Sequence, residues 1–184
     1  MKALEYKCDD LVDLFNHLFS ATENTVLIGG NDEPYYLPAS TSQSCHQLMF
    51  TKDYFASALH EISHWCIAGP ERRLQKDFGY WYKPDCRDAH EQQAFQQAEA
   101  RPQALEWLLT LATGRDFHLS LDNLQDSEAS ADEFGSLVRE QTLELVTNGL
   151  PERAAMFRES LCDFYHQQRA LPDIEYVKSY RFTL

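Results

Sequence analysis

The chain has 184 residues, a length that suits one domain with a well-buried core. Apolar residues make up 43% and aromatic residues 12%, which excludes a disordered chain. The net charge of −13 leaves no basic surface to neutralise a row of phosphates, so we expect no nucleic-acid partner. The same charge is compatible with a cationic substrate or a basic partner surface, although an acidic surface commonly serves only solubility.

The five cysteines are scattered and odd in number, and no two of them form a C-x-x-C pair. This usage favours reduced thiols and a cytoplasmic location over a disulfide framework. Residues 1–6 lack the apolar run of a secretory signal, and no stretch approaches the roughly eighteen apolar residues of a membrane span. We therefore expect neither export nor membrane insertion.

Apolar residues at three- and four-residue spacing predict a first amphipathic helix over residues 9–19. Short apolar and aromatic runs then predict three strands, at residues 25–28, 35–37 and 47–50. The first strand is expected to end at a turn formed by Gly29 and Gly30. The next helix is expected to take Thr51 or Asp53 as its N-cap and to stop at Gly69-Pro70.

Residues 71–87 are expected to form a loop, and a second long helix begins near Asp88 and runs to about residue 111. Asp88 and Glu91 have the spacing of a capping box. Two more helices are predicted at 132–147 and 151–169, the last with Pro151 in its first turn, and no pattern assigns the tail at 171–184. The expected fold is α+β, a mainly helical single domain over residues 1–184 with a small β-sheet.

The helix after the third strand contains the motif H-E-x-x-H, formed by His60, Glu61 and His64. Residues four apart lie one turn apart on the same helix face, so the two imidazoles can take neighbouring positions on one metal ion. Glu61 lies about 100° around the helix from His60, where it can approach a metal-bound water. A helical wheel places both histidines at the edge of a predicted buried arc consisting of Ala56, Leu59, Ser63 and Ile67. The alternative is a chance spacing of two histidines at the edge of the core.

Two histidines hold a divalent ion poorly, and no third histidine follows the motif closely. The second long helix offers three glutamates as the third ligand: Glu91, Glu99 and Glu106. Glu99 borders a predicted apolar face consisting of Phe95, Ala98, Pro102, Leu105 and Leu109. We therefore predict a metal site between two packed helices, with Glu99 favoured as its third ligand. The other two glutamates remain alternatives, and one of them is also explained by the capping box.

The loop between these helices carries aromatic and acidic residues that are candidate substrate contacts: Asp77, Tyr80, Trp81, Tyr82 and Asp85. Aromatic faces and carboxylates beside a metal would suit an ammonium-bearing side chain. The alternative is that the same residues only cover the core, which is the common role of aromatic side chains.

Two chemistries fit two histidines and a carboxylate. In a zinc peptidase the metal polarises the carbonyl and its water, and Glu61 takes the proton. In a non-haem iron oxygenase the three ligands leave open positions for dioxygen and substrate. The H-E-x-x-H spacing by itself favours the peptidase. A third class stays open, a non-enzymatic binding protein with a structural metal, which a closed shell of four ligands would support.

Several segments together resemble the bacterial elongation factor P hydroxylase family. They are A-S-A-L-H-E-I-S-H-W-C-I-A-G at 56–69, D-F-G-Y-W-Y at 77–82, P-Q-A-L-E-W at 102–107, D-N-L at 122–124 and T-N-G-L-P-E-R at 147–153. The resemblance covers most of residues 10–170. It implies an enzyme that hydroxylates the β-lysylated lysine of elongation factor P, the last step of a modification that supports translation through proline runs.

The resemblance also implies ligand roles for His60, His64 and Glu99, with Fe(II) as the expected metal and zinc as the alternative. The implied partners are β-lysylated elongation factor P and dioxygen. Under this interpretation Glu61 is not a ligand and orients a water or the substrate amine. No feature of the sequence identifies a 2-oxoglutarate site or the reductant.

Overall fold

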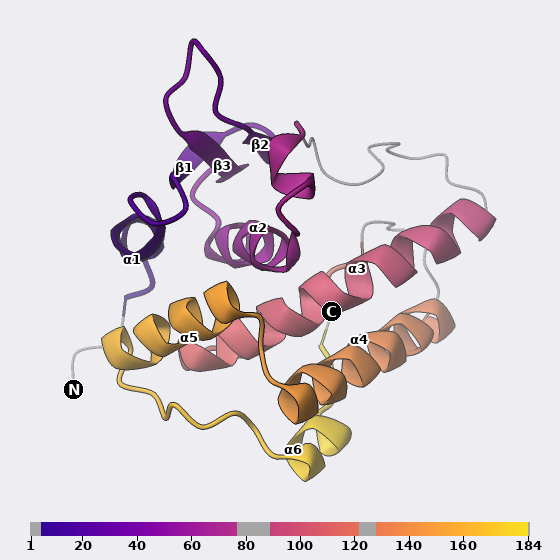
Figure 1. The fold of residues 1–184 in the computed structure, drawn as a ribbon. Helices are drawn as coiled ribbons and strands as arrows, with labels where there is room; N and C mark the ends of the chain where they lie inside the picture. Colours follow the sequence, from indigo (N-terminus) through magenta and orange to yellow (C-terminus); the bar gives the residue numbers. More distant parts are fainter. Residues whose placement is uncertain (1–4, 77–88, 122–127, 184) are drawn as a thin grey trace. The chain divides into compact units, whose positions relative to one another are not determined.

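The structure is a computed structural model that describes residues 5–76, 89–121 and 128–183 (Figure 1). The contacts within the chain divide it into two compact units, Met1–Gly79 and Tyr80–Leu184, and each is described by itself. The single domain expected from chain length stays a prediction. No helix in the described ranges combines the length and apolar character that crossing a bilayer would require. The mainly helical α+β class with a small sheet is confirmed.

The first unit combines two helices with a three-stranded sheet. Its elements are α1 (Cys8–Phe19), β1 (Thr25–Asn31), β2 (Tyr35–Leu37), β3 (His46–Thr51), α2 (Phe55–Ile67) and the 3₁₀ turn η1 (Arg72–Leu74). The strand order is β1-β3-β2, with β1 parallel to β3 and β2 antiparallel to it. Helix α1 packs on β1, and α2 packs on β3 (Figure 1). The three predicted strands and the first helix are therefore confirmed within one or a few residues.

An aromatic cluster joins the two helices of this unit. Phe15 and Phe19 of α1 each place their ring centroid 4.9 Å from the ring of Trp65 in α2. All three side chains are almost fully buried. Offset and edge-to-face contacts of this kind stabilise by about 0.5–1.5 kcal/mol beyond the area that they bury. The cluster thus fixes the C-terminal half of α2, where His64 precedes Trp65.

Strand β1 continues past the point where the sequence predicts its end. It runs through both glycines to Asn31, with an irregular register after Ile28. A Cβ atom at Gly29 would lie 2.6 Å from Cζ of Phe50, so this glycine permits a close approach inside the sheet. Gly30 has a φ of +87° and still donates its N–H to the carbonyl of Lys52. The predicted turn was therefore wrong, because the glycines serve the sheet.

The outer edge of β1 is occupied by a side chain. The amide of Asn16 in α1 accepts a hydrogen bond from the Leu27 N–H at 2.7 Å and donates one to the Leu27 carbonyl at 3.4 Å. Strand β1 has β3 on one side only, so its other side presents backbone groups that need partners. The Asn16 amide imitates a neighbouring strand at that position.

In its described residues the second unit contains four helices: α3 (Ala89–Ala112), α4 (Glu128–Asn148), α5 (Glu152–Phe164) and α6 (Ile174–Ser179). Helix α3 packs on α4 and α5, and α4 packs on α6 (Figure 1). The ring of Trp107 in α3 lies 4.7 Å from Tyr180 and 5.0 Å from Phe182 between centroids. The tail, to which the sequence assigns no element, thus contains a helix and contributes to the core.

Two predicted helix ends were wrong. The N-cap of α2 is Tyr54 and makes no side-chain cap bond, so neither Thr51 nor Asp53 caps this helix. Helix α5 ends at Phe164 instead of residue 169, and His166 follows with a φ of +57°. The segment after the helix is bonded back to it, because the Arg158 guanidinium and the Cys162 thiol donate to carbonyls of residues 168–170. The predicted capping residue Asp88 lies outside the described residues.

Candidate metal centre

The two histidines of α2 face each other. Both side chains are half-buried, and their Nε2 atoms lie 3.1 Å apart. The ring centroids are 4.7 Å apart, with an angle of 67° between the ring planes. The α-helix produces this arrangement, since it places residues i and i+4 one above the other on one face.

The separation of 3.1 Å suits two ligands of one ion. Two nitrogens that each lie about 2.1 Å from a metal, with an N–metal–N angle of about 90°, would be about 3.0 Å apart. A hydrogen bond between neutral imidazoles also fits this distance, with one Nε2 protonated and the other acting as acceptor. The rings therefore need little rearrangement to exchange that contact for a shared ion.

Helix α2 is oriented somewhat differently from the helical-wheel prediction. Its buried residues are Phe55, Ala58, Leu59, Ile62, Ser63, Trp65 and Cys66. The expected arc contained Ala56, which is exposed, and omitted Ala58 and Ile62, which are fully buried. The histidines nevertheless lie beside the buried face as predicted. This position fixes the backbone by packing and leaves the ring nitrogens accessible.

Glu99 of α3 is 5% exposed, which is unusual for a carboxylate. One ligand atom from each of His60, His64 and Glu99 lies within 4.8 Å of the others, a grouping that could hold a metal ion. Glu91 is half-exposed, and Glu106 is 5% exposed. Neither belongs to that grouping, and the choice of Glu99 as the third ligand stays a prediction.

The surroundings of Glu99 differ from the one-sided apolar face that the sequence predicts. Phe95, Pro102, Leu105 and Leu109 are buried as expected, whereas Ala98 is exposed. Residues 102–110 are buried around the whole circumference of α3. Pro102 has no N–H to donate to the carbonyl of Ala98, so the helix lacks one internal bond at the turn that carries Glu99.

The donor set of two imidazoles and one carboxylate suits both Fe(II) and Zn²⁺. Three ligands leave coordination positions open, which is typical of catalytic centres, while structural zinc sites are usually closed by a fourth ligand. Among the residues that the structure describes, the grouping has three members and no fourth. The residues present therefore fit a metal ion.

Of the remaining candidate residues, the structure describes Glu61 but not the proposed substrate contacts. Glu61 lies on α2, half-buried, between the two histidines in sequence. The substrate-contact candidates all fall at residues 77–85, outside the described residues, and stay predictions.

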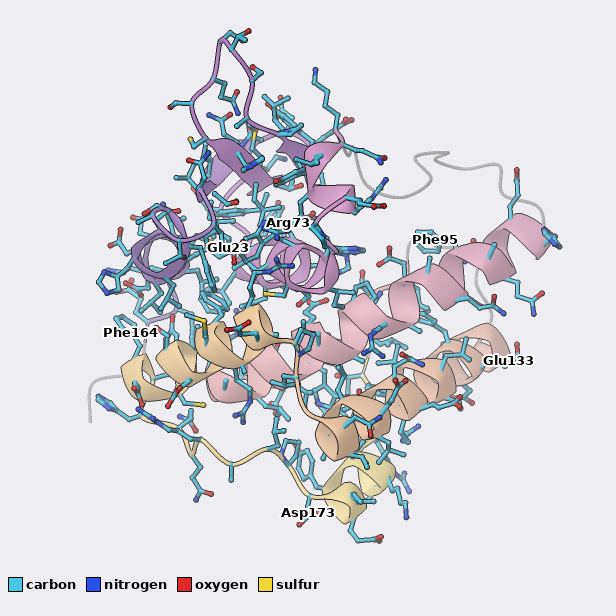
Figure 2. All side chains as sticks on the ribbon, viewed as in Figure 1. Glu23, Arg73, Phe95, Glu133, Phe164 and Asp173 are labelled. Carbon is cyan, nitrogen blue, oxygen red and sulfur yellow. The ribbon has the colours of Figure 1, made fainter. Side chains whose placement is uncertain are left out.

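A supporting network that the sequence did not reveal holds the end of α2. The Arg73 guanidinium lies 5.8 Å from the centroid of the Trp65 ring and places Nη1 2.6 Å from Oε2 of Glu23. Figure 2 shows Glu23 and Arg73 approaching one another. The Tyr36 hydroxyl donates to the Arg73 carbonyl at 3.0 Å. Glu23 and Arg73 are 50 residues apart, so no local pattern in the sequence could have paired them.

These observations define a mainly helical α+β protein with a candidate metal centre of two histidines and one glutamate. The sequence matches the family model described as elongation factor P hydroxylase over residues 14–174. A protein of Haemophilus influenzae named elongation factor P lysine hydroxylase is 43% identical over 162 residues, which cover 88% of this chain and 91% of that protein. The chain belongs to the elongation factor P hydroxylase family.

Proposed function

We propose that this chain is a metal-dependent hydroxylase that acts on a lysine of elongation factor P. The family match and the name of the 43% identical relative support the reaction and the protein substrate. The observation that carries the proposal is the grouping of two imidazoles and one buried carboxylate in a chain of this family. Such a donor set with open positions is typical of oxygen-activating iron enzymes.

In this proposal His60, His64 and Glu99 hold Fe(II), and the third ligand balances part of the charge of the ion. When bound, the iron supplies the dioxygen chemistry that side chains alone do not perform. Burial of Glu99 strengthens its attraction for a cation, because fewer water molecules screen the charge. Zinc is the alternative metal, since imidazole and carboxylate ligands accept both ions.

The remaining residues of the centre orient the ligands and the substrate. Leu59 and Ser63 are buried beside the histidines, and the Ser63 hydroxyl donates to the Leu59 carbonyl at 2.8 Å. Burial of these two side chains keeps this face of α2 against the core, and the α-helix itself places both imidazoles one turn apart on one side. We assign Glu61 the role of orienting the substrate amine, for which an ionised carboxylate is suited.

The proposed substrate is the lysine that carries a β-lysyl group, as the family resemblance implies. Such a side chain is long and cationic, and it needs carboxylates or aromatic faces beside the metal. Asp77, Tyr80, Trp81, Tyr82 and Asp85 are proposed as these contacts on the strength of their residue types. Dioxygen is proposed as the source of the added atom.

The test uses the full chain, loaded with Fe(II) without air and then mixed in air with elongation factor P and an excess of a reductant such as ascorbate, which supplies the two electrons that reduce the second oxygen atom of dioxygen to water. Two forms of the substrate are compared, one with and one without the β-lysyl group, and intact mass is measured. We expect the mass of one oxygen atom to be added to the lysylated form and little or none to the other. Failure of the iron-loaded chain to add oxygen, together with cleavage of test peptides by its zinc form, would contradict the proposal.

The Glu61→Gln variant separates the two chemistries further. A peptidase uses this carboxylate as its general base and would lose nearly all activity. In the hydroxylase the variant keeps its metal ligands, so we expect unchanged metal affinity, a raised KM for elongation factor P and measurable turnover. A complete loss of turnover with unchanged substrate binding would contradict the orienting role.

A further inference from the structure

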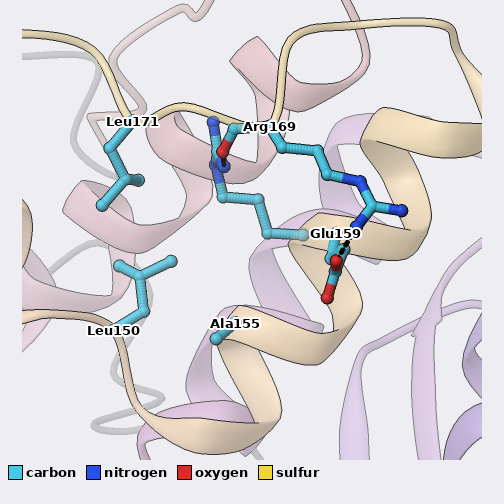
Figure 3. Close-up of a pocket in the computed structure, with 6 residues that line it drawn as sticks. Leu150, Ala155, Glu159, Arg169 and Leu171 are labelled. Carbon is cyan, nitrogen blue, oxygen red and sulfur yellow. Dashed lines mark hydrogen bonds and ion pairs between the residues drawn. The ribbon is translucent and has the colours of Figure 1, made fainter.

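A second site lies in the other part of the chain, at the start of α5. A cavity of about 270 Å³ is lined by Leu150, Ala155, Arg158, Glu159, Arg169 and Leu171. Figure 3 shows Leu150, Leu171 and Ala155 along one side and the Glu159–Arg169 pair along another. Leu150 precedes α5, three lining residues belong to α5, and Arg169 and Leu171 belong to the segment that follows this helix. The cavity therefore has an apolar part and a charged part.

Arg158 is the unusual member of the lining, since it is only 6% exposed. Its Nη1 donates to the Arg169 carbonyl at 2.6 Å and its Nη2 to the Ala170 carbonyl at 2.9 Å. Both acceptors are neutral, and its Nε–H has no hydrogen-bond partner in the described part of the chain. Burial lowers the pKa of this guanidinium, which nevertheless remains charged at neutral pH. A buried charge without a counter-ion is costly.

The other two charges of the cavity already compensate each other. The Arg169 guanidinium forms an ion pair with Glu159 and a two-pronged contact with Asp163, at 2.9 Å through Nε and 2.5 Å through Nη2. Within the described residues, no carboxylate lies at ion-pair distance from Arg158. Arg158 thus has no carboxylate partner of its own, whereas Arg169 has two, and a bound anion of a single charge would supply the missing partner.

We propose that this cavity binds a small aliphatic monocarboxylate. Its carboxylate would face the charge of the Arg158 guanidinium, whose Nη1 and Nη2 each keep a second N–H beside the one donated to a backbone carbonyl. The short hydrocarbon chain would lie against Leu150, Ala155 and Leu171. A phosphate dianion fits less well, because Glu159 would repel its second charge. This proposal is independent of the metal centre and of the hydroxylase reaction.

The test uses the full chain and two probes of equal shape, 4-methylpentanoate and the uncharged 4-methylpentanamide. Backbone N–H signals of Ala155, Ala170 and Leu171 are followed by ¹H–¹⁵N NMR at pH 7 during titration. We expect saturable shifts with the acid and at least about tenfold weaker binding of the amide, which corresponds to about 1.4 kcal/mol. Equal binding of the two probes, or no saturable shift up to about 10 mM acid, would overturn the proposal.

Arg158→Gln removes the charge but also loses bonds that hold the tail, so a second variant is needed. Ala155→Leu fills the cavity from an exposed position on α5 and leaves both Arg158 bonds intact. We expect it to fold and to lose at least tenfold in affinity for the acid. The matched control is Ala56→Leu, at an exposed position on α2, which should bind as the parent does.

Two further outcomes would overturn the proposal. One is unchanged binding of the acid by the Ala155→Leu variant. The other is saturable binding of an N-acetylated peptide that ends in leucine when the free acid does not bind. The second result would assign the cavity to the terminus of a protein chain instead of a small molecule.

Discussion

The burial of Glu99 has a chemical consequence for the candidate centre. Two neutral imidazoles and one ionised carboxylate carry a charge of −1 together, and a divalent ion reverses its sign. Because the carboxylate is 5% exposed, water does little to screen this change. The glutamate should therefore contribute more to metal affinity than an exposed acid at a similar distance would.

Replacing Glu99 by Gln removes the proposed anionic ligand while keeping the size of the side chain. We expect the affinity for Fe(II) or Co(II) to fall at least about 100-fold, because two histidines alone hold such ions poorly. Isothermal titration without air measures this affinity. The matched control is Glu91→Gln, at a half-exposed position on the same helix, which should bind metal as the parent does. Equal losses of metal affinity in the two variants would contradict the assignment of Glu99 as a ligand.

A second prediction at this scale concerns His46 in β3. Its Nδ1 accepts a hydrogen bond from the Ala39 N–H at 3.0 Å, and its ring stacks on that of Tyr36. Burial, and then the positive charge of Arg73, lower the pKa of this histidine below its ordinary value. The unfolded chain therefore binds a proton more readily than the folded one does. Stability from this residue is present above about pH 6.5 and is lost as the pH falls through the lower folded pKa.

Urea unfolding at pH 7.5 and pH 5 measures this effect. We expect His46→Asn to reduce the loss of stability on acidification, because its side-chain oxygen can accept the Ala39 bond and does not titrate. The matched control is His90→Asn, an exposed histidine, which should keep the pH dependence of the parent. An unchanged pH dependence in the His46 variant would contradict the assignment.

At the scale of elements, helix α3 ends at Ala112, and Gly114 in the turn that follows has a φ of +79°. A Cβ atom there would lie 2.8 Å from Nε2 of Gln167, whose amide donates to the Tyr165 carbonyl. We therefore expect Gly114→Ala to lower the free energy of unfolding by about 1–2 kcal/mol, measured in urea. The control is Gly69→Ala after α2, where nothing lies within 4 Å, and it should change stability little. Equal effects of both changes would show that the contact with Gln167 is unimportant.

The elements differ in how well the sequence predicts them. Helices α1 to α4 follow from apolar periodicity because their packing faces repeat along the chain. The start of α2 and the end of α5 do not, since α2 begins without a side-chain cap and side chains of α5 bond the segment that follows it. At Gly29 the sequence correctly indicates a special backbone position, but only the approach of Phe50 shows that it lies inside a strand.

The candidate centre is predictable to a similar extent. The spacing of His60 and His64 fixes their geometry, because both lie on one helix. Glu99 is 35 positions further along the chain, and the helical wheel could only rank it among three glutamates. The network of Glu23, Arg73 and Trp65 has no local signature, because its parts come from separate elements.

For the molecule as a whole, the proposed ligands come from both compact units. His60 and His64 belong to Met1–Gly79, and Glu99 belongs to Tyr80–Leu184. A ligand that binds only the folded state stabilises every part that contributes to its site, by about 2.7 kcal/mol at a concentration 100 times its dissociation constant. The stabilisation that a bound metal ion provides should therefore extend beyond the helix that carries the histidines.

Hydrogen exchange with mass spectrometry tests this prediction on the full chain. We expect Co(II) to slow exchange in β3 of the first unit and in α4 of the second, and a chelator to reverse both effects. The His60→Ala variant should show neither effect. Protection confined to the first unit would contradict the assignment of Glu99 as a ligand of the same ion.

The side chain of Asn16 has a further consequence, for the behaviour of the protein at high concentration. An uncovered strand edge invites another polypeptide to add to the sheet, which is a common route to aggregation. At Leu27 the amide of Asn16 already occupies both backbone groups, so an added strand would have to displace two hydrogen bonds. Asn16 thus hinders the addition of a second strand at this point of the sheet edge.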